Sequence, residues 1–197
     1  DCLATPEGAT VDMDGCSDVQ AGNARFNIYY NNFFTNYDFM GMALASDTHS
    51  KAYAYVTVGA QAKLVDRISW VGSSIEETST PSFRITYHLA IPEAPHKPWT
   101  HVWNAYDVTA HSSEDITLYT DGTAKQAQIF TAELPETLAL HALGHHHFSI
   151  QYLDSSASNT WEWFGNSHAT GYSNLGDNNE SDTTLIPGRL YMQLSHQ

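Results

Sequence analysis

The sequence predicts an all-β protein built as a sandwich of two antiparallel β-sheets. From Arg25 onward, short runs rich in Tyr, Val, Ile, Phe and Thr are separated by Gly, Asn, Asp, Ser and Pro, a pattern typical of strands joined by turns. About ten such runs follow one another, which is more than a single open sheet accommodates well. Two sheets stacked face to face therefore provide the natural arrangement.

The clearest strand covers residues 82–91. Its apolar residues are Phe83, Ile85, Tyr87, Leu89 and Ile91, and they alternate with Arg84, Thr86, His88 and Ala90. Because successive side chains of a strand point to opposite faces, we expect the first set to face the core and the second set to face solvent.

The other strands are expected from the same signals. In chain order they cover residues 26–30, 51–58, 66–71, 99–106, 116–120, 125–131, 145–153, 160–164 and 189–195. Asp121 and Gly122 separate two of these runs and favour a hairpin. Residues 135–143 fit either a strand or a short helix, since their apolar residues alternate within an Ala- and Leu-rich run. Residues 165–187 are rich in Asn, Ser, Asp and Gly, so we expect a long surface loop there.

The charge of the chain restricts its partners. Its 197 residues include 8 Lys and Arg against 22 Asp and Glu, a formal net charge of −14. This charge repels nucleic acid and anionic lipid, so we expect neither as a partner. It favours a neutral ligand, and an acidic polysaccharide would need cations gathered in one cleft. The chain lacks an apolar run long enough to span a membrane and a leader before Asp1, so we expect a soluble mature fragment without membrane contact.

The first eighteen residues resemble the last unit of a thrombospondin type 3 repeat array. The residues that match the pattern of that family are Cys2, Pro6, Gly8, Val11, Asp12, Gly15 and Cys16, and Leu3 stands where the family has Pro. Such arrays are extracellular, calcium-loaded spacers between modules. The resemblance implies a secreted, multimodular protein in which residues 1–20 end a spacer and residues 21–197 form one module with a single core.

Cysteines and acidic residues of this segment suggest two further features. Cys2 and Cys16 are the two cysteines of the chain, and in a secreted context we expect them to form a disulfide. Asp12, Asp14 and Asp18 cluster on the same loop and offer the hard oxygen ligands that calcium prefers. We therefore expect a structural calcium ion there, although an acidic, solvated turn explains the same residues.

A second resemblance concerns the main module. Residues 99–107 contain Trp99, His101-Val102 and Tyr106-Asp107, and residues 116–122 end in Leu118-Tyr119-Thr120-Asp121-Gly122. Together they are similar to the central signature of concanavalin A-like, laminin G-like jelly rolls, and residues 188–192 stand where that family has its last strand. Trp103 occupies a position that is usually small, and the gap before Ile116 is longer than usual. The resemblance implies a jelly roll, with a bacterial immunoglobulin-like sandwich as the alternative topology.

Aromatic and polar side chains on these strands provide candidate ligand contacts. Sugars bind with their C–H faces on aromatic rings while their hydroxyls bond to polar groups. We expect Trp70 and Trp99 in the core, whereas Trp103 and the pair Trp161 and Trp163 fit either the core or a ligand platform. The candidate stacking residues are Trp103, Trp161, Trp163 and Tyr172, and the candidate hydrogen-bonding residues are Arg84, His88, Asn104, His147 and Gln151. The polar set also fits an ordinary solvated face.

Enzyme signatures are mostly missing from the sequence. His145 and His147 resemble the His-x-His of cupins, but the accompanying Glu and the second His motif are missing, which weighs against a catalytic metal. Gln128-Ile129-Phe130 lacks the His of the Gln-Ile-His triplet of alginate lyases. Two carboxylates on distant strands would still suffice for glycoside hydrolysis.

These observations lead to one principal hypothesis. We expect a monomeric, non-catalytic carbohydrate-binding module, covalently linked to the catalytic module of a secreted polysaccharide-degrading enzyme that acts on a polysaccharide of algal or similar origin. A small jelly-roll glycoside hydrolase or polysaccharide lyase is the alternative, and an adhesive module that meets a protein partner is the third.

Overall fold

The protein is described here by a computed structural model, which is interpreted for residues 42–47, 49–75, 80–91, 94–112, 115–120, 123–154, 160–166, 172–177 and 183–196. These residues form strands and connecting segments and include no helix that could cross a membrane. The strands are β1 (Met42–Ala45), β2 (Ser50–Thr57), β3 (Lys63–Ser73), β4 (Ser82–Ile91), β5 (Ala94–Thr109), β6 (His111–Ser112), β7 (Ile116–Thr120), β8 (Thr123–Leu140), β9 (His145–Tyr152), β10 (Glu162–Asn166), β11 (Tyr172–Asp177), β12 (Thr183–Pro187), β13 (Arg189–Leu190) and β14 (Met192–Ser195).

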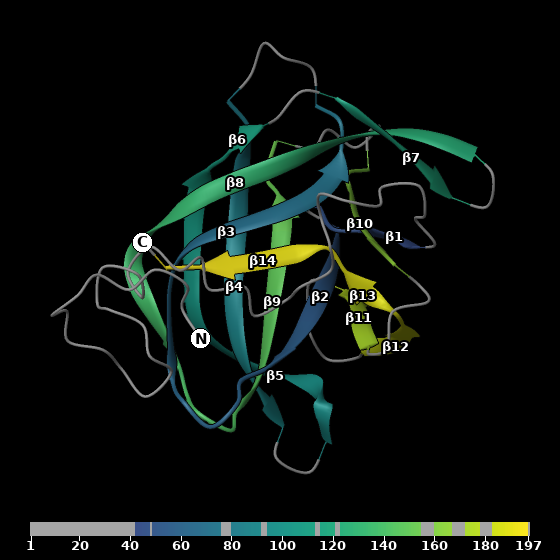
Figure 1. The fold of residues 1–197 in the computed structure, drawn as a ribbon. Helices are drawn as coiled ribbons and strands as arrows, with labels where there is room; N and C mark the ends of the chain where they lie inside the picture. The colour runs from purple at the N-terminus through teal and green to yellow at the C-terminus, as the bar shows by residue number, and fades with distance from the viewer. Residues whose placement is uncertain are drawn as a thin grey trace, which may run out of the picture.

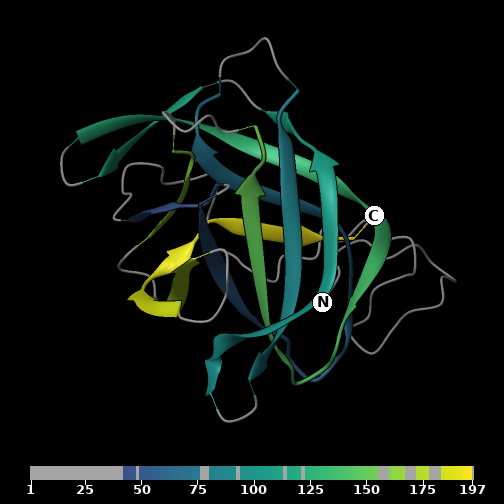
Figure 2. The same ribbon diagram turned by 180° about the vertical axis from the view of Figure 1, so that it is seen from behind.

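The strands form two antiparallel sheets, as the sequence predicts. The eight-stranded sheet has the order β1-β10-β3-β8-β6, with β13 on β10, β14 on β3 and β7 on β8. The six-stranded sheet has the order β12-β11-β2-β9-β4-β5. In Figure 1 the long strands β3 and β8 and the short β14 run in front of and across β2, β9 and β4, and Figure 2 shows the six-stranded sheet from its other side. The all-β sandwich is therefore confirmed.

The core lies between the two sheets and is rich in aromatic rings. Phe83 of β4 lies at its centre, with its ring centroid 4.9 Å from that of Trp70 and 5.2 Å from that of Phe130, both from the opposite sheet. Phe148 and Ile150 of β9 extend this layer and are fully buried. Large rings that meet edge to face combine a big buried apolar area with favourable ring geometry.

The predicted strands agree with the structure where alternation is strong. β4 and β7 have the predicted bounds, and residues 135–140, which fitted either a strand or a helix, continue β8. Thr120 pairs with Thr123 across β7 and β8, as expected for a two-residue hairpin. The short β1 was not predicted. Residues 26–30 and the proposed spacer, residues 1–20, lie outside the described residues.

The expected surface loop at residues 165–187 is wrong in part. β11 and β12 lie in this segment and pair with each other, and β11 also pairs with β2. Two apolar side chains of this largely polar segment, Leu175 and Ile186, pack against the core. Each of the two strands has only one such side chain, so its sequence signal is weak.

Trp161 and Trp163 belong to the core, which corrects their assignment as a solvent-facing ligand platform. Trp161 is 3% exposed and Trp163 is fully buried. Their indole N–H groups donate to backbone carbonyls, Trp161 to Ser73 at 3.1 Å and Trp163 to Tyr191 at 2.9 Å. Gly72 makes room for the Trp161 indole, since a Cβ at Gly72 would lie 2.1 Å from Trp161 Cζ2. By contrast, Trp103 is 55% exposed.

This contrast predicts different costs for the same substitution. Trp163→Ala leaves a large cavity and is expected to lower the free energy of unfolding by about 3–5 kcal/mol. Trp103→Ala removes a largely solvated ring and should change it by no more than about 0.5 kcal/mol. Urea unfolding followed by circular dichroism measures both. Equal effects of the two substitutions would contradict the assignment of Trp163 to the core.

Candidate functional site

A polar hollow lies on the outer face of the six-stranded sheet, the face opposite the core. Its volume is about 480 Å³, and it is lined by Lys51 of β2, Arg84 and Thr86 of β4, Val102, Ala105 and Asp107 of β5, Gln151 of β9 and the adjoining Leu153. Lys51, Arg84 and Gln151 each neighbour a core residue in sequence, so strand alternation directs them outward. The hollow therefore follows from the same pattern that builds the core.

The register of the sheet brings the polar residues of different strands together. Arg84 of β4 pairs with Gln151 of β9 on one side and with Asp107 of β5 on the other. One step along the strands, Thr86 lies between Ser149 and Ala105 in the same way. Side chains directly opposite each other on one face lie close enough to interact. Segments distant in sequence thus contribute to one continuous surface.

Arg84 and Asp107 form a bidentate ion pair at the side of the hollow. Arg84 Nε donates to Asp107 Oδ1 at 2.7 Å, and Nη2 donates to Oδ2 at 2.8 Å. The hydrogen bonds from Arg84 lower the pKa of the Asp107 carboxyl, and those to Asp107 raise the pKa of Arg84. Both side chains are about half exposed, so the pair contributes little to stability. The ion pair instead holds the Arg84 guanidinium in one orientation.

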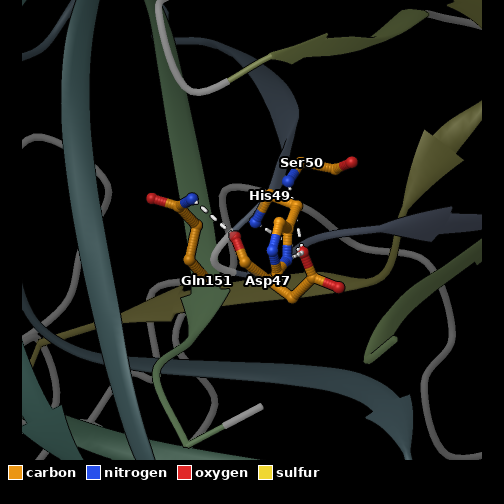
Figure 3. A network of polar contacts seen from close by, with 4 residues as sticks. All are labelled: Asp47, His49, Ser50 and Gln151. Atoms are coloured by element: carbon orange, nitrogen blue, oxygen red, sulfur yellow. Dashed lines mark hydrogen bonds and ion pairs between the residues drawn. The ribbon is translucent and has the colours of Figure 1, made fainter. Parts of the chain in front are cut away.

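Gln151 is oriented by the turn that joins β1 to β2, drawn in Figure 3. Asp47 Oδ1 accepts hydrogen bonds from the backbone N–H groups of His49 at 2.8 Å and Ser50 at 3.2 Å. The backbone carbonyl of Asp47 accepts a hydrogen bond from Gln151 Nε2 at 2.8 Å. The turn therefore holds the Gln151 amide with its Nε2 directed toward Asp47 and its Oε1 directed away (Figure 3).

The same turn is tied to β9 by a second contact. Ser46 Oγ donates to the backbone carbonyl of Ile150 at 2.6 Å and accepts from the backbone N–H of Ala52 at 3.1 Å. Ser46 is fully buried. Two buried hydrogen bonds on one hydroxyl make this connection specific, since leaving either partner unsatisfied is costly.

Lys51 places a cation at the floor of the hollow. It is 6% exposed, and its Nζ lies 5.8 Å from the centroid of the Tyr53 ring. A ring face attracts an ammonium group through its quadrupole. Lys51 and Tyr53 lie on the same face of β2, next to the polar row of the neighbouring strand β9.

His88 and His147 lie on this outer face but are fully buried, which corrects the expectation that they face open solvent. Rings of β2 pack against them: the Tyr53 ring lies 5.5 Å from that of His88, and the Tyr55 ring 5.2 Å from that of His147. His147 Nε2 lies 3.2 Å from the Pro95 carbonyl. Burial lowers the pKa of His147 to about 3, so its imidazole is neutral at neutral pH.

Three buried polar atoms beside the hollow lack a hydrogen-bond partner among the described residues. They are Thr86 Oγ1, His147 Nδ1 and Ser149 Oγ. Their side chains are at most 2% exposed. Native structures leave few such atoms unsatisfied, because each one costs about 1–3 kcal/mol. This part of the sheet therefore retains capacity for hydrogen bonding.

The remaining expected site residues are Trp103, Asn104 and Tyr172. Trp103 lies on β5 next to the hollow-lining Val102, at a register shift where it has no partner residue on β4. Asn104 is half-buried, and its Nδ2 lies 3.4 Å from Glu136 Oε1, which also accepts from Tyr106. Tyr172 begins β11, and its side chain is not among those described.

The expected disulfide and calcium site cannot be located in the structure. Cys2, Cys16, Asp12, Asp14 and Asp18 all lie outside the described residues. Within the described ranges, no group of three His, Cys, Asp or Glu side chains is arranged to hold a metal ion.

Sequence reasoning found Arg84 and Gln151 but missed the rest of the hollow. Lys51, Thr86 and Asp107 all appear in predicted strands or motifs at outward positions, and alternation alone could have nominated them. Their proximity depends on which strands pair, and that is not readable from one strand. Asp47 could have been identified as a turn residue, because an Asp carboxylate in a turn accepts a hydrogen bond from the backbone N–H two residues further on, here that of His49.

Burial of His147 predicts a pH dependence of stability. Below the ordinary histidine pKa of about 6.5, the unfolded chain binds a proton that the folded chain does not bind until the pH approaches about 3. The free energy of unfolding should therefore fall as the pH falls through this window, by at most about 1.4 kcal/mol per pH unit from this group. Urea unfolding between pH 7 and 5 measures the slope, which His147→Gln should reduce. An unchanged slope in that variant would contradict a neutral, buried His147.

The Asp47 turn predicts a matched pair of variants. Asp47→Ala removes the acceptor for two backbone N–H groups and should lower the free energy of unfolding by about 1–2 kcal/mol. Asp47→Asn keeps a side-chain oxygen in the same place and should recover most of this loss. Chemical denaturation of both variants provides the test. If the two variants lose the same stability, the turn does not depend on the side-chain acceptor.

Family models and curated proteins add no relative to this description. A scan against protein-family models and a search of curated proteins both find no match. The antiparallel β-sandwich is consequently established by the structure itself. The resemblances to a jelly-roll module and to a thrombospondin type 3 repeat stay predictions.

Proposed function

We propose that this chain is a carbohydrate-binding module whose ligand lies in the hollow on the outer face of the six-stranded sheet. The observation that carries the proposal is the set of polar side chains that converge there from four neighbouring strands. Two of them are held in place by neighbouring groups, Arg84 by the Asp107 carboxylate and Gln151 by the Asp47 backbone carbonyl. Preorganised polar groups lower the cost of binding a ligand.

The lining suits a sugar because it combines two kinds of contact. Arg84, Gln151 and Thr86 offer hydrogen-bonding groups to hydroxyls, while Val102 and Leu153 offer apolar surface to C–H groups. Sugar rings present both kinds of group along their length.

Trp103, which follows the hollow-lining Val102 in sequence, supports this proposal. An indole that is 55% exposed contributes apolar surface without packing in the core. The register shift at this position increases the local twist of β5 and changes the direction of the side chain. Trp103 is therefore the remaining candidate for stacking on a sugar ring among the tryptophans whose side chains are described.

A binding role is favoured over glycoside hydrolysis by the carboxylates of the hollow. Hydrolysis canonically requires two carboxyl groups, one on each side of the scissile bond. Among the described lining residues Asp107 is the one carboxylate, and its bond to Arg84 keeps it ionised and unsuited to donate a proton. In the proposed full-length protein, the module would tether a secreted catalytic module to its polysaccharide and raise the local substrate concentration.

Affinity gel electrophoresis with a panel of plant and algal polysaccharides tests the proposal. We expect retention on at least one glycan, and Trp103→Ala should weaken it roughly 3- to 10-fold by removing a stacking contact. Leu64→Ala is the matched control, because Leu64 is 48% exposed but lies on β3 of the other sheet. Absence of retention on every glycan would contradict the proposal. Release of reducing or unsaturated ends would show that the protein is an enzyme rather than a non-catalytic binding module.

A further inference from the structure

We infer that the glycan bound in the hollow is acidic and carries carboxylate groups, as uronate-containing polysaccharides do. This inference rests on the proposed function, because it names the class of sugar that the same site would take. It reverses the expectation of a neutral ligand from the net charge of the chain. Three features of the hollow support it: the distribution of charge, the unused donors of Arg84 and the orientation of Gln151.

The distribution of charge separates the hollow from the rest of the molecule. The chain carries a formal net charge of −14. Among the described residues that line the hollow, Lys51 and Arg84 stand against the one carboxylate of Asp107, which gives these residues a formal charge of +1. The nearby Asp47 carboxylate accepts backbone hydrogen bonds within its own turn. Cations gathered in one concavity attract an anionic ligand even when the overall charge is negative.

Arg84 retains hydrogen-bond donors in a geometry that suits a carboxylate. Its bonds to Asp107 use two of the five N–H donors of a guanidinium. The remaining three, on Nη1 and Nη2, have no partner among the described residues, and they include the pair at the end of the planar group. That pair can hold the two oxygens of a second carboxylate. Asp107 fixes the orientation of the group beforehand.

Gln151 complements this arrangement on the side toward Lys51. It pairs in register with Arg84, and its amide is held by the Asp47 carbonyl so that Oε1 points away from Asp47 (Figure 3). An amide oxygen accepts hydrogen bonds, so it suits a sugar hydroxyl next to the carboxylate rather than the carboxylate itself. The hollow thus offers cationic donors and a neutral acceptor side by side, as a hydroxylated acid requires.

The energetic preference follows from the kind of hydrogen bond formed. Hydrogen bonds between charged partners are shorter and roughly twice as strong as those between neutral groups. A uronate carboxylate would form hydrogen bonds of the first kind with the remaining Arg84 donors, whereas a neutral sugar would supply only an uncharged hydroxyl oxygen to them. Binding of a uronate would therefore weaken with salt as the attraction is screened.

The test compares one polymer in two forms. Polygalacturonate and alginate oligosaccharides are measured by isothermal titration calorimetry beside the same oligosaccharides after reduction of their carboxyl groups to alcohols. We expect carboxyl reduction to weaken binding roughly tenfold or more, and raising salt from 50 to 500 mM to weaken the acidic form alone. Sulfated agar-type oligosaccharides form a third arm, and preferential binding of these would overturn the assignment to carboxylates.

Variants on the protein side use a matched control. Arg84→Gln and, separately, Lys51→Gln should each weaken uronate binding roughly tenfold while affecting a carboxyl-reduced ligand much less. Arg67→Gln is the control, because Arg67 forms a comparable pair with Glu133 at 2.8 Å on the eight-stranded sheet. Circular dichroism confirms folding, and the ligand-side comparison does not depend on any variant.

The outcomes separate this inference from the proposed function. Binding of uronate and reduced glycan with equal affinity, or insensitivity to both Lys51→Gln and Arg84→Gln, would overturn the acidic ligand while the carbohydrate-binding role stands. Failure to bind any glycan in the panel would instead remove the proposed function itself.

Discussion

The position of β9 between β2 and β4 is the constraint on which the rest of the structure depends. Phe148 and Ile150 of β9 are buried against the aromatic layer of the opposite sheet, and Phe83 of β4 lies beside them. Because side chains alternate strictly, burying these residues sends Gln151 outward next to Arg84. A slip of one residue would exchange the two faces, so the packing of the core also determines the composition of the outer surface.

Neighbouring groups hold two side chains of the outer surface in fixed orientations. Asp107 on β5 orients the Arg84 guanidinium, and the Asp47 turn orients the Gln151 amide. Rings of Tyr53 and Tyr55 pack against His88 and His147, which are both fully buried. The sheet thus concentrates two cations and several neutral polar groups on a strongly acidic protein. This local reversal of charge is the basis for expecting an acidic sugar.

The positions of many strands could be predicted from the sequence. Which face of a strand is buried, and which strands pair with each other, could be predicted much less well. Residues 82–91 were predicted with the observed bounds, because five apolar residues alternate without interruption. Alternation correctly placed Trp161 and Trp163 on one face, but it does not say which face is buried, and both proved to lie in the core. The hollow itself depends on long-range pairing of β2, β9, β4 and β5, which no local pattern encodes. β11 and β12 were missed because only Leu175 and Ile186 mark their apolar side in a largely polar segment.

The most direct test of this account is the side-chain NMR response of the hollow to a uronate oligosaccharide. The Arg84 Nε–Hε signal and the Gln151 side-chain amide signals report on two neighbouring strands at the proposed site. The account predicts that these signals and the backbone amide of Thr86 shift together during titration, while signals from the outer face of the eight-stranded sheet stay unchanged. Shifts confined to the eight-stranded sheet, with Arg84 and Gln151 unaffected, would contradict it.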